Sequence, residues 1–223
     1  MVTATGATAE EVLSSTELYL EQVETCTSHL PDAVDAYGTD PDAFVAAVDR
    51  LSAVESECDA TLRELRTLVG EALPPNFTEV FLRVEDVSTL YARIDVVPNR
   101  AEQFARELGA MDPGLSRETR DSLRGMATLV AEATTVLTDA TGAYVEGLVT
   151  AGEPVRVRDA VESVAALEGE CDGHKYVALR RAFGTLPTAE ALVVRQLLLS
   201  IDAAMDAAED AADHLLSMAG ADW

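Results

Sequence analysis

The chain has 223 residues, of which 40 are acidic and 16 basic, so its formal net charge is −24. This length is enough for one large or two modest domains, and a hydrophobic share of 48% predicts that the chain folds. A surface this negative repels phosphate backbones, which excludes nucleic acid as an expected partner. No apolar run reaches the roughly 18 residues that cross a bilayer, and we find no secretion signal in the first residues. We therefore expect a soluble, cytoplasmic protein.

The basic residues and the cysteines describe the environment in which the chain works. Fifteen of the sixteen basic residues are arginine, and Lys175 is the only lysine. Together with the acid excess, this composition is typical of adaptation to high salt, where screening makes self-repulsion tolerable. Cys26, Cys58 and Cys171 are an odd set without a C-x-x-C motif, which argues against a disulfide framework or a thiolate zinc site. We expect three reduced, buried thiols.

Proline and glycine divide the sequence into six segments of helical length. Each is rich in helix-forming residues and lacks the period-2 alternation of a strand, and apolar residues recur instead at spacings of three and four. The expected helices are 8–30, 42–69, 77–108, 115–150, 155–183 and 188–218. Long helices with one apolar stripe and short connections pack as antiparallel bundles, so the sequence predicts an all-α fold.

An internal repeat relates the two halves of the chain. The run Glu55–Asp59 (E-S-E-C-D) recurs as Glu168–Asp172 (E-G-E-C-D), 113 positions later. Ile94-Asp95 likewise recurs as Ile201-Asp202, 107 positions later. The sequence therefore predicts two tandem antiparallel three-helix bundles, residues 1–112 and 113–223, related by pseudo-twofold symmetry. The two repeats pack as two domains or as one.

The acidic residues of the repeat share helix faces. Glu55 and Asp59 lie one turn apart, as do Glu168 and Asp172. In the last segment, spacings of 4, 3 and 4 put four carboxylates in one line: Asp202, Asp206, Glu209 and Asp213. Like charges at this spacing repel one another unless a cation lies among them. A hard metal ion such as Mg, Ca, Mn or iron takes several carboxylate oxygens at once.

Two explanations compete with a metal site. A solvated acidic face is the ordinary explanation for any one acidic pair in so acidic a chain. Glu55 and Glu168, however, lie on the apolar lines of their helices, where an unpaired carboxylate is costly and needs a partner. Arginine on a neighbouring helix is the alternative partner, and the candidates are Arg83, Arg93, Arg180 and Arg195. Recurrence of the motif at matching positions in both halves favours the metal.

Pro98 is the one proline inside a predicted helix. It cannot donate a hydrogen bond to the carbonyl of Ile94, so we expect the helix to kink or restart there. Asn99, with Glu102 three residues later, either caps the restarted helix or contributes to the acidic motif.

The tandem acidic pattern, E-x-x-x-D on the second helix and D-x-x-x-D or E-x-x-x-D on the third, resembles the PhoU-like proteins. The segment Leu82–Val87 (L-R-V-E-D-V) is similar to a degenerate form of the D-R-E-D-I segment of their shorter relatives, the PhoU-related phosphate transport regulators. The resemblance covers about residues 40–108 and 155–216. It implies multinuclear metal clusters, iron among other ions, on the outer faces of the bundles.

Transferred position by position, the resemblance implies two metal sites. The first would use Glu55, Asp59 and Asp95, and the second would use Glu168, Asp172, Asp202 and Asp206. The sequence departs from the pattern at Asn99, where the second repeat has Asp206. We therefore expect the second site to be the better formed of the two.

The resemblance also implies a function, a non-catalytic regulator of inorganic phosphate transport and phosphate homeostasis. Its partners would be a phosphate transporter, either an ABC-type permease or a symporter, and a sensor kinase. Membrane contact would come only through the transporter, and exposed bundle faces suggest a homodimer. Two alternatives stay open: a salt-adapted helical scaffold without metal, and a carboxylate-bridged metalloenzyme such as a phosphohydrolase or oxidase. The absence of E-x-x-H pairs and of nucleotide-binding or nucleophile motifs disfavours the enzyme.

Overall fold

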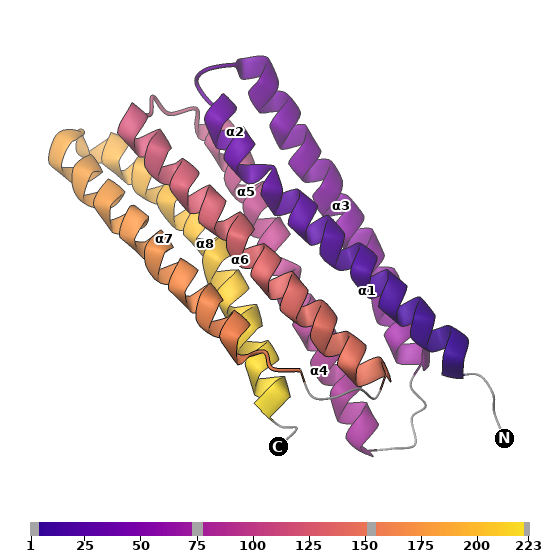
Figure 1. The fold of residues 1–223 in the computed structure, drawn as a ribbon. Coiled ribbons are helices and arrows are strands. Elements are labelled where there is room, and N and C mark those ends of the chain that lie inside the picture. The colour runs from indigo at the N-terminus through magenta and orange to yellow at the C-terminus, as the bar shows by residue number, and fades with distance from the viewer. Residues whose placement is uncertain (1–4, 73–77, 151–154, 221–223) are drawn as a thin grey trace.

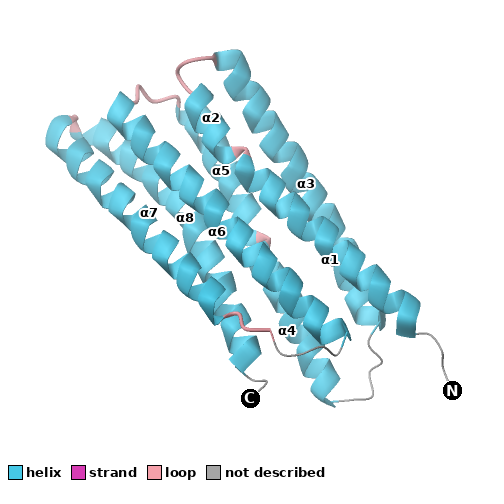
Figure 2. Cartoon of the chain, viewed as in Figure 1, coloured by secondary structure: helices cyan, strands magenta, loops and turns pink. Residues whose placement is uncertain are grey.

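The computed structural model describes residues 5–72, 78–150 and 155–220. Within these ranges the regular structure is entirely helical, as Figure 2 shows. The helices are α1 (Thr5–Ser28), α2 (Leu30–Ala36), α3 (Pro41–Ala72), α4 (Thr78–Ile94), α5 (Val96–Met111), α6 (Arg117–Thr150), α7 (Arg158–Thr185) and α8 (Thr188–Gly220). The all-α prediction is confirmed.

The first expected helix is longer than predicted and is interrupted. The sequence predicts a helix end at residue 30, before Pro31, whereas α1 ends at Ser28 and α2 resumes the helix over Leu30–Ala36. Pro31 falls in the first turn of α2, where its missing N–H has no helical partner to lose. The chain turns away only after Tyr37, at Gly38, whose φ of +70° suits a residue without a side chain.

The third expected helix is divided into α4 and α5 at Asp95, three residues before Pro98. The predicted interruption is therefore confirmed. The backbone N–H of Asp95 still donates to the carbonyl of Tyr91 at 3.0 Å, and Asp95 keeps right-handed helical angles. The interruption is thus a local loss of hydrogen bonding rather than a reversal of the chain.

The helices run along a common direction and form one bundle (Figure 1). In the first half α1 packs on α3, and in the second α7 packs on both α6 and α8. The halves meet where α1 contacts α6 and where α5 contacts α8, so α3 and α7 lie at opposite sides of the bundle (Figure 1). The buried apolar residues of both halves form one continuous core. The predicted boundary after residue 112 falls in the connection between α5 and α6.

None of the described helices combines the length and apolar character needed to span a membrane.

Candidate functional site

The first acidic cluster lies where α3 passes the α4–α5 junction. We define it as Glu55 and Asp59 from α3, Asp95 from the junction, and Glu102 from α5. Glu55, Asp95 and Glu102 are half-buried, so the cluster lies at the edge of the core. The sequence predicted Glu55, Asp59 and Asp95, and the structure brings these three together. Glu102 joins them through the packing of α5, which the repeat alone did not indicate.

Burial and mutual repulsion raise the pKa of carboxyl groups in the first acidic cluster. Burial raises the pKa of Glu55, and the charges of Asp59 and Glu102 raise it further. Burial also raises the pKa of Asp95, and Asp59 adds to this effect. Raised carboxyl pKa values mean that the folded chain disfavours the full negative charge of the cluster. Neutralising it would therefore stabilise the fold.

The cations near the first acidic cluster lie at its rim. Arg63 approaches Asp59 at 3.6 Å, but its side chain is 70% exposed. Arg106 approaches Glu102 at 2.9 Å and is 66% exposed, and Ser52 also donates to Glu102 at 2.8 Å. Ion pairs this open to solvent are screened and contribute little to stability. Arg66, which is also exposed, acts to lower the pKa of Asp95, but the pKa values of Glu55 and Asp95 stay raised overall.

Asp95 is positioned by its backbone and by Tyr19. The Tyr19 hydroxyl donates to the carbonyl of Tyr91 at 3.2 Å and to Oδ1 of Asp95 at 3.5 Å. Burial, followed by the charge of Asp95, raises the pKa of Tyr19, which keeps the phenol protonated as a donor. The Asn99 side-chain amide donates to the Asp95 carbonyl at 2.7 Å and approaches Oδ2 at 3.4 Å. Asn99 therefore supports Asp95, and the N-cap position of α5 is Asp95 rather than Asn99.

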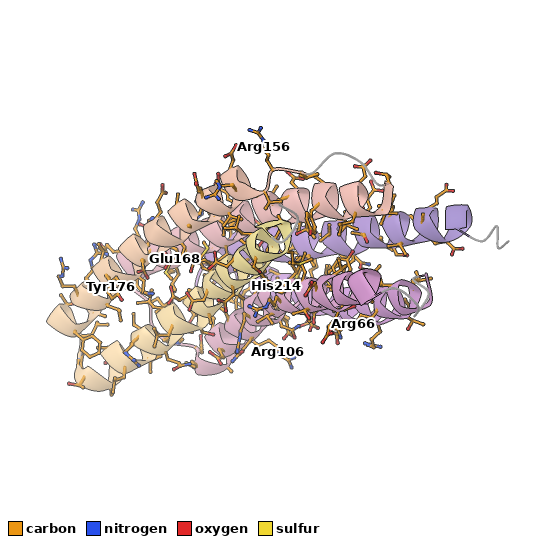
Figure 3. All side chains as sticks on the ribbon, turned by 90° about the horizontal axis from the view of Figure 1, so that it is seen from below. Arg66, Arg106, Arg156, Glu168, Tyr176 and His214 are labelled. Carbon is orange, nitrogen blue, oxygen red and sulfur yellow. The ribbon has the colours of Figure 1, made fainter. Side chains whose placement is uncertain are left out.

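The second acidic cluster lies between α7 and α8 and contains a cation. Its carboxylates are Glu168 and Asp172 from α7, with Asp202, Asp206 and Glu209 from α8. Lys175 forms an ion pair with Asp172 and donates to Oδ2 of Asp202 at 2.6 Å. Lys175 and Asp202 are 8% and 7% exposed, so this contact is buried. Glu168 lies along α7 together with Tyr176 (Figure 3).

The ammonium of Lys175 opposes the repulsion among the carboxylates of the second acidic cluster. Burial lowers the pKa of Lys175, but its hydrogen bonds to Asp172 and Asp202 outweigh burial, and the pKa is raised overall. Burial raises the pKa of Glu168, and Asp172 adds to this, while Lys175 acts in the opposite direction. Asp206 follows the same pattern, with burial and Asp202 raising its pKa. The lysine is therefore charged, and it offsets part of the repulsion around it.

Lys175 is not among the partners that the sequence suggested for the acidic residues, which were all arginines. Arg93 donates to the backbone carbonyl of Asp210 at 3.4 Å, which joins α4 to α8. The side chain of Arg83 lies outside the described residues. Sequence reasoning missed Lys175 as the partner, although a signal was present. It is the only lysine, and it follows Asp172 by three positions, so both side chains share one helix face.

The fit of these residues to a metal ion differs between the two clusters. Over residues 5–72, 78–150 and 155–220, no three histidine, cysteine or acidic side chains converge closely enough to hold a metal ion. In the second cluster the Lys175 ammonium already bonds Asp202 and pairs with Asp172, so these residues do not fit a metal. The first cluster has the carboxylate oxygens that a hard cation prefers, but its side chains would have to rotate to meet at one ion.

The cysteines beside the two clusters are buried and free, as predicted. Burial raises the pKa of Cys58 to about 12, with Asp95 adding to the effect. Burial likewise raises the pKa of Cys171 to about 12, with Asp202 adding to it. At neutral pH both are thiols, and a thiol is a poor metal ligand. They act as small apolar side chains next to the carboxylates.

Comparisons with known proteins identify the fold. No protein-family model matches the chain, and no curated protein matches it. A PhoU-like protein from Shewanella oneidensis MR-1 superposes with a TM-score of 0.80 at 16% identity, covering 94% of this chain and 99% of that one. A second structure from the same organism, described as a PhoU-like phosphate regulatory protein, gives 0.78 at 16% identity over 95% and 100% of the two chains. PhoU from Pseudomonas aeruginosa gives 0.71 at 16% identity over 96% and 98%.

Identities this low establish the arrangement of the helices and nothing finer. The likeness extends over nearly the whole of each chain, and the tandem bundle expected from the repeat agrees with it. The resemblance inferred from the acidic motifs is confirmed at this level: the chain has the fold of the PhoU-like proteins.

Proposed function

We propose that this chain is a non-catalytic regulator of inorganic phosphate transport and phosphate homeostasis. The observation that carries the proposal is the PhoU-like fold, which extends over 94–96% of the chain in three solved structures. One of them is described as a phosphate regulatory protein. The acidic motifs from which the resemblance was first inferred lie at the edge of the core in both halves. Their carboxylates supply charge for recognition and helix pairing, and we assign them no catalytic step.

A cytoplasmic face of a phosphate transporter is the partner we propose, in an ABC-type permease or a symporter. Cytoplasmic loops of membrane proteins carry an excess of lysine and arginine. A chain with a net charge of −24 is complementary to such loops, and this complementarity would speed association and make it sensitive to salt. A sensor kinase is the second partner that this role would involve. Self-association into a homodimer stays a prediction.

We propose that the first acidic cluster binds a metal ion and that the second does not. Carboxylate oxygens such as those of the first cluster's four side chains bind Mg, Ca, Mn or iron. The pKa values of Glu55 and Asp95 are raised, so their charged forms are disfavoured without a cation. A bound cation would relieve that repulsion and tie α3 to the α4–α5 junction. Substitution of Asp95 by asparagine in the purified chain should then lower its metal content. Elemental analysis of wild-type and D95N protein measures this directly.

Phosphate uptake by cells tests the regulatory proposal. A strain of the source organism that lacks the gene should take up radiolabelled phosphate at a rate that no longer responds to the external phosphate concentration. Restoring the wild-type gene should restore the response. If the deletion strain adjusts its uptake between phosphate-limited and phosphate-rich media as the parent does, the proposed function is wrong.

A further inference from the structure

We infer that Lys175 is the permanent cation of the second acidic cluster, so that this half of the molecule neutralises its carboxylates with its own ammonium and takes up no metal ion. The two halves then share an acidic motif but differ in what neutralises it. This inference rests on the contacts of the second cluster. It does not depend on the proposed role in phosphate transport, nor on a metal in the first cluster.

The contacts of Lys175 are those of a bridge between two helices. Its side chain leaves α7 one turn after Asp172, pairs with that carboxylate, and reaches α8 to donate to Oδ2 of Asp202 at 2.6 Å. The side chains of Lys175 and Asp202 are each 10% exposed. The ring of Tyr176 adds a contact, with Nζ 5.2 Å from its centroid. A buried charge pair with this geometry is held because separating it would leave a bare charge in the protein interior.

A metal ion in the same place would compete with this ammonium. A hard cation needs several oxygens at about 2.0–2.6 Å, and Asp172 and Asp202 are the carboxylates that the ammonium already engages. The other acidic side chains of the cluster, Glu168, Asp206 and Glu209, are more exposed than Asp202. A metal ion would have to displace Lys175 from its buried partners and would meet its positive charge. Both effects oppose binding.

The sequence repeat identifies the residue that distinguishes the halves. Under the offset of 113 positions that relates Asp59 to Asp172, Lys175 corresponds to Leu62. Leu62 is buried, 3% exposed, and follows Asp59 by three positions as Lys175 follows Asp172. The first half thus has an apolar side chain where the second has a cation. Substitution of Lys175 by leucine recreates the first-half arrangement in the second half.

Binding of Mn²⁺ to the full, metal-stripped chain tests the inference. We expect the number of bound Mn²⁺ ions, counted by equilibrium dialysis and elemental analysis, to be unchanged by Asp202→Asn in the wild-type chain. Lys175→Leu should add one Mn²⁺ per chain, and combining K175L with D202N should remove it again. If the D202N variant, which keeps Lys175, binds fewer Mn²⁺ ions than the wild-type chain, the inference is overturned. Failure of a folded K175L variant to gain an ion overturns it as well.

Two further measurements keep the test decisive if K175L does not fold. Asp206 is exposed, so D206N should leave the fold intact, and we expect it to leave Mn²⁺ binding unchanged too. Because Lys175 is the only lysine, selective carbon-13 labelling reports its Cε signal alone. That signal should not shift up to saturating Mg²⁺, whereas a shift would show the ammonium being displaced and would overturn the inference. If the wild-type chain binds no Mn²⁺ at all, the inference on Lys175 is supported, and the proposal that the first cluster binds a metal ion is refuted.

Discussion

Replacing Lys175 with methionine removes the positive charge of the second acidic cluster while keeping an unbranched side chain. Asp202 then loses the ammonium 2.6 Å from its Oδ2, although its side chain is only 10% exposed. Removing one partner of a buried ion pair destabilises a protein by about 3–5 kcal/mol. The second carboxylate, Asp172, is 35% exposed, so water offsets part of its loss. We therefore expect the free energy of unfolding to fall by about 3 kcal/mol, near the lower limit of that range.

Urea denaturation at a fixed, high KCl concentration measures this change. The circular dichroism of the helices gives the free energy of unfolding by linear extrapolation, and the slope with urea should stay constant. D202N and the K175M/D202N double variant complete a double-mutant cycle, with an expected coupling of about 2 kcal/mol.

The surface ion pair between Arg124 and Asp35 provides a matched control. Its Nε–Oδ2 distance is 2.7 Å, almost that of the buried pair, but the side chains are 54% and 50% exposed. Asp35→Asn should therefore change stability by only a small fraction of the effect of K175M. Equal effects of D35N and K175M, or an additive double-mutant cycle, would refute the reasoning, since the energy assigned to the bridge depends on its burial.

Three other predictions concern the first cluster and the charge of the whole chain. Glu55→Gln should raise the free energy of unfolding in metal-free buffer at neutral pH by about 0.5–1 kcal/mol, because it removes repulsion from three neighbouring carboxylates. The raised pKa of Glu55 means that the folded state holds this proton more tightly than the unfolded chain does. The gain should therefore shrink as the pH falls through the folded pKa and vanish below the unfolded pKa; a gain independent of pH in urea denaturation would contradict this. Leu62→Lys should place an ammonium beside Asp59 and reduce any Mn²⁺ bound by the first cluster in equilibrium dialysis, whereas unchanged binding would show that the two positions are not equivalent. Molar KCl should raise the melting temperature by screening a net charge of −24, and a melting temperature that is flat with salt would count against salt adaptation.

The helices could be predicted because their signals are local. Apolar residues at spacings of three and four define each helix face, and the missing N–H of Pro98 already implies the interruption found at Asp95. The interruption at His29 could not be predicted in the same way. Pro31 indicates a helix end from sequence alone, whereas in the structure it begins a further short helix that packs on α3 and α6. Whether a proline ends a helix or begins one depends on what the following residues can bury.

The acidic clusters were predictable along each helix but not between helices. Glu55 with Asp59, and Glu168 with Asp172, are one turn apart in any helix, so their shared faces follow from spacing. The joining of Glu102 to the first cluster depends on how α5 packs against α3, which no local pattern encodes. The same holds for Lys175, since its contact with Asp202 requires α7 and α8 to lie in one particular register. The sequence favoured a metal ion, with arginines on neighbouring helices as the alternative partners, whereas in the structure the single lysine contacts Asp202 and Asp172.

The fold accommodates either residue at the position shared by Leu62 and Lys175 because both present an apolar stem to the core. The leucine side chain ends within the core, so the carboxylates at the edge of the core contact solvent or an added cation. A lysine passes its methylene groups through the same apolar surroundings and delivers an ammonium to Asp202, 2.6 Å away on α8. The side chain at this position therefore stays buried in both halves while its charge differs. On the inference drawn above, one side chain in each half decides whether its acidic motif is open to a cation or neutralised by the protein itself.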